Sequence, residues 1–203
     1  MQEERKRVTL ALTGASGVQY GLRLLECLLA ANCRVDLMIS KAAHLVIATE
    51  TREELPANPD KLTARLMERF TSLPGQVQAF GREDWFAPAA SGSGAASSMV
   101  ICPCSGGTLS ALATGASNNL IERAGDVALK ERRQLLIVTR EMPLHQVHLE
   151  QMLKLTQMGA VILPASPGFY HQPGSVDDLV DFVVARILDL LGLPQQLVRR
   201  WGE

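Results

Sequence analysis

Residues 7–21 read RVTLALTGASGVQYG, a short apolar run that leads into a glycine-rich turn. The run from Arg7 to Thr13 follows a charged start and is typical of a buried strand. After the turn, apolar residues recur at helical spacing from Val18 to Ala31. This stretch therefore predicts a strand, a tight loop and a helix, which form the first unit of an α/β fold.

The alternation of strand and helix patterns continues to the end of the chain. Further strands are predicted over 34–39, 76–80, 99–102, 135–139 and 160–163, with Pro103 closing the strand before it. Helices are predicted over 18–31, 41–50, 61–70, 108–113, 120–132, 144–158 and 175–191. Strands that alternate with helices build a parallel sheet between two helical layers, so we expect a three-layer α/β fold with a mostly parallel sheet.

The 203 residues show no internal repeat and no linker long enough to divide the chain. We therefore expect residues 1–203 to form a single domain. Residues 1–6 are expected to be a disordered tail. Residues 51–90 contain a polar, proline-bearing stretch and are expected to form a peripheral, insertion-like region.

The composition excludes several classes of protein. Lysine and arginine number 20 against 21 aspartates and glutamates, and this balance argues against non-specific nucleic-acid binding. Hydrophobic residues make up 47% of the chain, which argues against intrinsic disorder. Four cysteines are too few for a disulfide scaffold, and no secretory segment opens the sequence. We therefore expect a soluble, cytoplasmic protein with reduced thiols.

The stretch from Trp85 to Ile121 contains no charged residue. A membrane-spanning helix needs about 20 mostly apolar residues, and Ser, Gly and Pro interrupt this stretch too often for that. We therefore expect no membrane association. The stretch is instead typical of loops that line a ligand or of a surface that is buried against another subunit, although residues 87–98 suit a plain loop nearly as well.

Small hydroxyl residues, glycines and one charged pair follow the ends of the predicted strands. Because the carboxyl ends of parallel strands meet at one edge of the sheet, these residues are expected to gather there. Glycine-rich turns and helix N-termini favour an anion, and the edge therefore predicts a phosphorylated ligand. The residues concerned are Gly14, Ala15, Ser16, Gly17, Ser40, Lys41, Ser105, Thr108, Arg140 and Glu141.

Two familiar kinds of site do not match the motifs. The first loop is not G-x-G-x-x-G, and Asp36 lies in mid-strand rather than at a strand end, so NAD is disfavoured. Cys102 and Cys104 are separated by one residue and have no second pair, so no metal site is predicted. Cys102 is expected in the core, whereas Cys104 could line the site.

Spacing alone leaves several roles open. Thr108 equally suits a simple helix cap and a phosphate or ribityl ligand. Arg186, among apolar neighbours, suits either a buried ion pair or a phosphate ligand. Lys130 stands four residues after Asp126, so a helical ion pair is its ordinary role. His145 and His148 are expected to be solvated or interface residues rather than metal ligands.

A set of motifs spread over nearly the whole chain resembles one family, the UbiX flavin prenyltransferases. The motifs are TGASGVQYG, SKAA with Glu50, CPCSGGTL, LIERAGDVALKERR, TREMPLH, and GFYHQP followed by SVDDLVDFVVARILD. The resemblance implies a flavodoxin-like or Rossmann-like fold that assembles as a homo-dodecamer, with each active site between subunits. It implies a metal-independent enzyme that joins the five-carbon unit of dimethylallyl monophosphate to N5 and C6 of reduced FMN. The product, prenylated FMN, would serve a UbiD-type decarboxylase in ubiquinone synthesis.

The resemblance also implies roles for individual residues. Glu141 is the expected proton-handling carboxylate, Ser16 is expected to relay that proton, and Glu50 is expected to complete the site from a neighbouring subunit. Expected FMN contacts are Gly14, Ala15, Ser16, Ser40, Ser105, Gly106, Gly107, Thr108 and Arg140. Expected contacts to the dimethylallyl phosphate are Tyr170, Arg186, Lys130, Glu50 and Arg123, of which Lys130 and Glu50 are also counted as catalytic.

Two other functions compete with this one. An FMN-dependent decarboxylase of the same fold group would need a catalytic histidine and an asparagine motif after the fourth strand. Asn118 and Asn119 do not lie at that position. A flavin carrier without catalysis would need the FMN contacts but not Glu141, Lys130, Tyr170 and Arg186 together.

Overall fold

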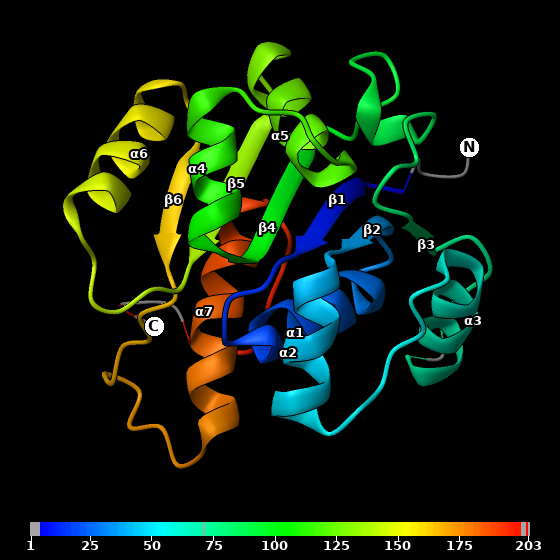
Figure 1. Ribbon diagram of the computed structural model, residues 1–203. Coiled ribbons are helices and arrows are strands. Elements are labelled where there is room, and N and C mark those ends of the chain that lie inside the picture. Colours follow the sequence, from blue (N-terminus) through cyan, green and yellow to red (C-terminus); the bar gives the residue numbers. More distant parts are fainter. Residues whose placement is uncertain (1–4, 71, 200–201, 203) are drawn as a thin grey trace.

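The computed structural model describes residues 5–70, 72–199 and 202. Its strands are β1 (Arg7–Leu12), β2 (Arg34–Ile39), β3 (Val77–Phe80), β4 (Ser98–Cys104), β5 (Gln134–Thr139) and β6 (Val161–Pro164). All six pair in parallel in one sheet, in the order β3-β2-β1-β4-β5-β6 (Figure 1). The order runs outward in both directions from β1 and β4, so the chain reverses its winding between these two strands.

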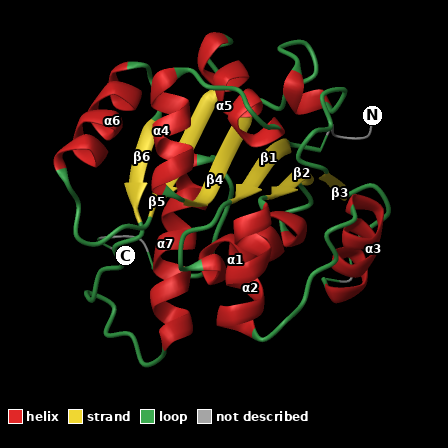
Figure 2. Ribbon diagram, viewed as in Figure 1, coloured by secondary structure: helices red, strands yellow, loops and turns green. Residues whose placement is uncertain are grey.

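Helices cover both faces of the sheet (Figure 2). They are α1 (Val18–Ala30), α2 (Lys41–Thr51), α3 (Pro59–Arg69), α4 (Gly106–Thr114), α5 (Leu120–Lys130), α6 (Gln146–Gln157) and α7 (Val176–Leu190), with a short 3-10 turn, η1 (Pro88–Ala90). Five of the helices begin at a Ser or Asn whose side-chain oxygen accepts a backbone N–H of the first turn. These side chains satisfy helix donors that have no partner within the helix.

Alternation along the strands sorts the core into two halves. On β1, Val8, Leu10 and Leu12 pack with the apolar faces of α1, α2, α3 and α7. Ala11 of β1 and Ile101 of β4 face the other way and pack with α4, α5 and α6. A sheet that is covered on both faces needs apolar side chains at both odd and even positions of each strand, which is why the strands are continuous apolar runs in the sequence.

The predicted fold class is confirmed, and every predicted strand and helix is present. The prediction that Pro103 closes the fourth strand is wrong, because β4 continues to Cys104. Its register with β5 shifts between Ile101 and Cys104, where Pro103 has no N–H to donate. The region 51–90 contains α3, the 3-10 turn and β3, which pairs with β2 at the edge of the sheet. Of the expected N-terminal tail, residues 1–4 lie outside the described residues, while Lys6 binds the Leu191 carbonyl.

Asp36 is a structural acid. Its carboxylate is fully buried on β2 and forms an ion pair with Arg7, with 2.5 Å between Nη2 and Oδ2. Burial raises the pKa of the Asp36 carboxyl, and the Arg7 guanidinium opposes that shift. This placement agrees with the inference that the acid of this strand does not serve a dinucleotide ribose.

Gly21 allows α1 to lie close to the sheet. A Cβ at this position would stand 2.2 Å from the Cys102 carbonyl oxygen and 2.9 Å from Cγ of Leu12. Gly21→Ala must therefore push α1 away from β1 and β4, and we expect it to lower the free energy of unfolding by about 1–3 kcal/mol. Urea unfolding followed by circular dichroism measures this. Gly107→Ala is the control, because a Cβ on Gly107 would meet nothing within 4 Å and the substitution causes no clash. Gly75→Ala is unsuitable, because Gly75 has a positive φ that alanine rarely adopts.

Candidate active site at the carboxyl edge of the sheet

A cavity of about 550 Å³ opens at the carboxyl ends of the central strands, where the strand order reverses. In open α/β sheets this is the position at which ligands bind. Five of the predicted FMN contacts line it together, namely Gly14, Ser40, Ser105, Gly107 and Thr108. The structure thus brings together residues that lie up to 94 positions apart in the sequence.

Three helices begin at this cavity. Ser40, Ser105 and Asn119 are the N-caps of α2, α4 and α5, and all three line it. The open choice for Thr108 is partly resolved, because Ser105 is the cap and Thr108 lies in the first turn of α4. The Ser105 hydroxyl accepts the Thr108 N–H at 3.4 Å and donates to Thr108 Oγ1 at 3.1 Å. Three helix N-termini directed at one cavity favour a negatively charged ligand group.

The remaining lining fits a flavin nucleotide. Met38, Leu45, Phe80 and Ile121 supply apolar surface for a ring system. Gly107 presents bare backbone, since a Cβ there would meet nothing within 4 Å. Lys41 and Arg82 add positive charge at the rim, and the volume lies within the range of about 300–1,000 Å³ that is usual for cofactor sites. The residues present therefore suit a phosphorylated, partly apolar ligand.

The first loop is fixed by two charged side chains. The Glu50 carboxylate, near the end of α2, accepts the N–H groups of Gly17 at 2.9 Å and Val18 at 3.2 Å. It therefore occupies the N-terminus of α1 of its own chain. The Arg140 guanidinium donates from Nε to the Ser16 carbonyl at 3.2 Å. Ser16 and Arg140 thus lie together, as the sequence predicts.

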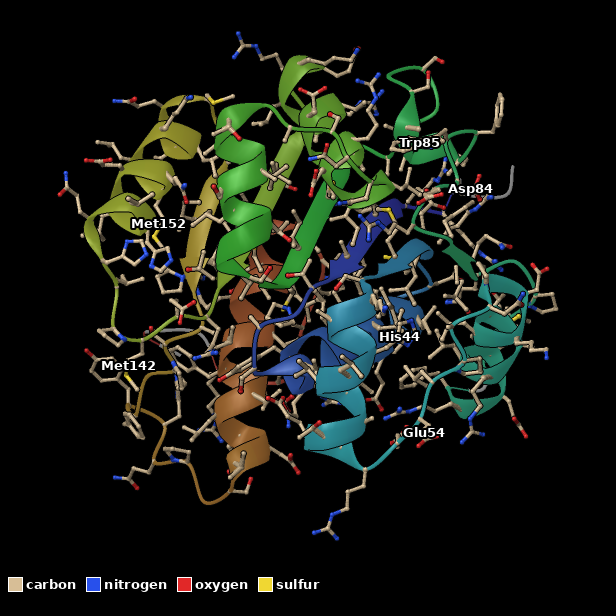
Figure 3. All side chains as sticks on the ribbon, viewed as in Figure 1. His44, Glu54, Asp84, Trp85, Met142 and Met152 are labelled. Atoms are coloured by element: carbon tan, nitrogen blue, oxygen red, sulfur yellow. The ribbon has the colours of Figure 1, made fainter. Side chains whose placement is uncertain are left out.

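Glu141 lies beside the N-terminus of α4. If Gly106 carried a Cβ, that atom would lie 3.8 Å from Oε2 of Glu141 and 3.2 Å from Nε2 of His148. Both side chains therefore approach this glycine closely. The His148 ring stacks on His145, with 3.7 Å between ring centroids. Glu141 is exposed and is followed by Met142, which lies at the edge of the molecule (Figure 3). Glu141 does not line the cavity, but its exposed carboxylate lies beside Gly106, whose neighbours Ser105 and Gly107 do.

Cys104 does not line the cavity. Its thiol is buried, and burial raises the pKa to about 12. Burial also raises the pKa of Cys102, which lies in the core as expected. A thiol that stays protonated is a poor nucleophile, so neither cysteine suits covalent catalysis.

Tyr170 and Arg186 line a second cavity of about 910 Å³, formed by α7, the segment before it and the C-terminal residues 192–199. The alternative of a buried ion pair for Arg186 is wrong. Its side chain is 59% exposed and forms an i,i+3 pair with Asp189 at 3.0 Å. The guanidinium therefore remains accessible to a ligand from this cavity.

Lys130 and Arg123 lie on α5. The helix begins at the first cavity, and Lys130 is ten residues further on, about 15 Å along the helix axis. The expected pair between Lys130 and Asp126 is wrong, because Lys130 pairs with Glu131 and Asp126 with Arg123. One chain therefore does not bring Lys130 to the cavity that holds Gly14 and Ser40.

No role was predicted from the sequence for two residues, Arg82 at the cavity and Thr13 behind it. Arg82 follows the edge strand β3 and reaches the cavity rim from the region that was expected to be peripheral. Thr13 is buried between the first loop and the end of β4. The signal that could have identified Thr13 is its position, since it places a hydroxyl at the end of an apolar strand and directly before the glycine-rich loop.

Comparison with known proteins shows the family to which this chain belongs. The model of the Flavoprotein family matches residues 1–188. The flavin prenyltransferase UbiX of Pseudomonas aeruginosa is 65% identical over 198 residues, which are 98% of this chain and 95% of that protein. A UbiX crystal structure in complex with FMN and dimethylallyl pyrophosphate is 38% identical and has a TM-score of 0.87, covering 98% of this chain and 99% of that one.

A third relative carries a different description. The dodecameric FMN-dependent UbiX-like decarboxylase from Escherichia coli O157:H7 is 37% identical with a TM-score of 0.85, covering 97% of this chain and 100% of that one. Fold and site define an α/β flavoprotein with its ligand cavity at the switch point of the sheet. Within that class, the chain belongs to the family of UbiX flavin prenyltransferases, which confirms the resemblance seen in the motifs.

Proposed function

We propose that this chain joins the dimethylallyl group of dimethylallyl monophosphate to N5 and C6 of reduced FMN and so makes prenylated FMN. The observation that carries the proposal is the convergence of Gly14, Ser40, Ser105 and Thr108 on one cavity beside Glu141. The FMN and dimethylallyl pyrophosphate in the related crystal structure support the same ligand classes.

In this proposal the loops at the carboxyl edge hold FMN. Gly14–Ser16, Ser40 and the Ser105–Thr108 turn bind it, with Arg140 beside Ser16. When bound, reduced FMN supplies the nucleophile, so no activated serine or cysteine is needed. The apolar lining excludes water from the reacting atoms.

The leaving phosphate needs cations, because negative charge grows on it as its bond to the allyl carbon breaks. We assign this role to Arg186 with Tyr170, and to Lys130 with Arg123. The first bond replaces the proton on N5 as phosphate leaves, and the second bond needs a proton added to the double bond of the dimethylallyl unit and a proton removed from flavin C6. We assign delivery and acceptance of the protons of this second step to Glu141, assisted by Ser16. Glu50 holds the first loop within its own chain, and we retain it as a contributor to the substrate site.

We propose that the protein assembles as a homo-dodecamer, in which a neighbouring copy brings Lys130 to the FMN cavity. Lys130 is distant from the first cavity in its own chain, so a second copy must supply it. The outer face of α6 carries exposed Leu149 and Leu153, at 54% and 60%, next to the loop of Glu141. Apolar side chains exposed at i,i+4 spacing suit contact with another copy. The dodecameric state of the Escherichia coli relative supports this assembly.

Among the described residues, no helix is long and apolar enough to cross a membrane. We propose cytoplasmic activity, in a single domain, with a UbiD-type decarboxylase in ubiquinone synthesis as the recipient of the product. Adding such a decarboxylase without its cofactor to the reaction tests this part. Decarboxylation that depends on the present protein would support it.

Phosphate release tests the proposed reaction. The protein is mixed with dimethylallyl monophosphate and FMN under anaerobic conditions, with and without dithionite. We expect phosphate release only with reduced FMN.

The description of the Escherichia coli relative favours a decarboxylase as the second candidate. In that case no phosphate would appear, and carbon dioxide would be released from a carboxylated substrate.

A further inference from the structure

Thr13 connects the two loops to which FMN binding is assigned. It follows β1, is 1% exposed, and immediately precedes Gly14. On the other side of the sheet's switch point stands Ser105, the N-cap of α4. The two loops belong to different strand–helix units, so their relative position depends on contacts between the units.

Both backbone polar groups of Thr13 are engaged at this point. Its N–H donates to the Pro103 carbonyl at 3.1 Å, and its carbonyl accepts the Ala15 N–H at 2.9 Å. The first bond links the ends of β1 and β4, and the second closes the turn that begins the first loop. These bonds would survive any substitution except proline.

The hydroxyl of Thr13 adds two bonds that only a side chain can make. Oγ1 donates to the Pro103 carbonyl at 2.8 Å and accepts the Ser105 N–H at 2.7 Å. Both bonds lie where the register of β4 with β5 is irregular. The Ser105 N–H also precedes α4 and has no acceptor within the helix.

The contact continues into the ligand loop. Ser105, whose backbone Thr13 holds, in turn bonds Thr108 through its own hydroxyl at 3.1 Å. Both Ser105 and Thr108 line the cavity, whereas Thr13 is absent from its lining. Thr13 therefore reaches the ligand only through residues that it holds in place.

We propose that Thr13 is a positioning residue for flavin binding, whose hydroxyl sets the N-terminus of α4 against the first loop. The inference rests on the proposed function, since it takes FMN as the ligand of this cavity. It predicts that FMN affinity depends on the hydroxyl itself and not on the volume or the backbone of residue 13.

Four variants of the full-length protein separate these contributions. Thr13→Val keeps the volume and loses the hydroxyl, while Thr13→Ser keeps the hydroxyl. Thr13→Ala differs from Thr13→Ser by the oxygen alone and decides the matter even if Thr13→Val does not fold. Thr9→Val is the matched control, because Thr9 is a buried threonine of β1, the strand that Thr13 follows, and its hydroxyl makes no hydrogen bond to another described residue.

FMN affinity is measured by quenching of flavin fluorescence, at a temperature at which circular dichroism shows each variant folded. We expect Thr13→Val and Thr13→Ala to bind FMN at least about ten times more weakly than the wild type. Thr13→Ser and Thr9→Val should stay within about threefold. Equal losses in Thr13→Ser and Thr13→Ala, or wild-type affinity in Thr13→Val, would overturn the inference. A wild-type protein that does not bind FMN would instead contradict the proposed function, and the inference with it.

Discussion

Glu141→Gln is expected to keep FMN bound and to slow formation of the prenylated flavin by a factor of roughly 10²–10⁴. That range is what a positioned general acid or base usually contributes. The amide has nearly the same shape as the carboxylate but cannot accept the proton released at flavin C6. Because Glu141 is exposed beside Gly106 and supports no core packing, the protein should fold normally.

The measurement is single-turnover conversion of bound flavin, followed by absorbance and by mass. Glu150→Gln on α6 is a matched control, since Glu150 is exposed and bonds only Gln146 among the described residues. Normal turnover by Glu141→Gln would contradict the assigned proton transfer. Loss of FMN binding in the same variant would show that Glu141 is a binding residue instead.

Arg186→Leu is expected to raise the concentration of dimethylallyl monophosphate needed for half-maximal rate by about 10- to 100-fold. Hydrogen bonds to charged groups contribute about 1.5–3 kcal/mol, which corresponds to that range. FMN binding should be unchanged, because Arg186 lines the second cavity and not the first. Arg65→Leu is the matched control, since Arg65 forms a comparable i,i+3 pair, with Glu68, on α3.

Mixed oligomers extend this prediction to the assembly. If Lys130 of one copy serves the site of another, Lys130→Leu and Arg186→Leu should each be slow alone at a dimethylallyl monophosphate concentration well below that needed for half-maximal rate in either variant. Dissociating and reassembling an equal mixture should then restore part of the activity, because some sites would receive both native residues. No recovery despite verified reassembly would place Lys130 and Arg186 on the same copy with respect to each site.

The succession of elements could be predicted because its signal is local. Each strand is a short apolar run and each helix an apolar periodicity, and these patterns survive in the structure with boundaries shifted by a few residues. The gathering of Gly14, Ser40 and Ser105 followed from the rule that parallel strands share a carboxyl edge. The error at Pro103 arose because proline removes a donor, although its carbonyl remained available to Thr13.

Contacts between distant segments carried no such signal. Glu50 holds the N-terminus of α1 from 33 positions away, and Arg82 reaches the cavity from a region that looked peripheral. The spacing of Asp126 and Lys130 permits an ion pair, but each residue pairs with a neighbour nearer in the sequence. Asp126 pairs with Arg123, and Lys130 pairs with Glu131. Nor does spacing show which copy of the chain supplies Lys130, because that depends on surfaces that meet only after folding.

The mass of the flavin after reaction tests the central claim most directly. The wild-type protein is incubated anaerobically with reduced FMN and dimethylallyl monophosphate, without added metal, and the flavin is then released and weighed. The account predicts a flavin heavier by one five-carbon dimethylallyl unit, with one phosphate released for each flavin converted. FMN that stays bound with its mass unchanged would contradict the account.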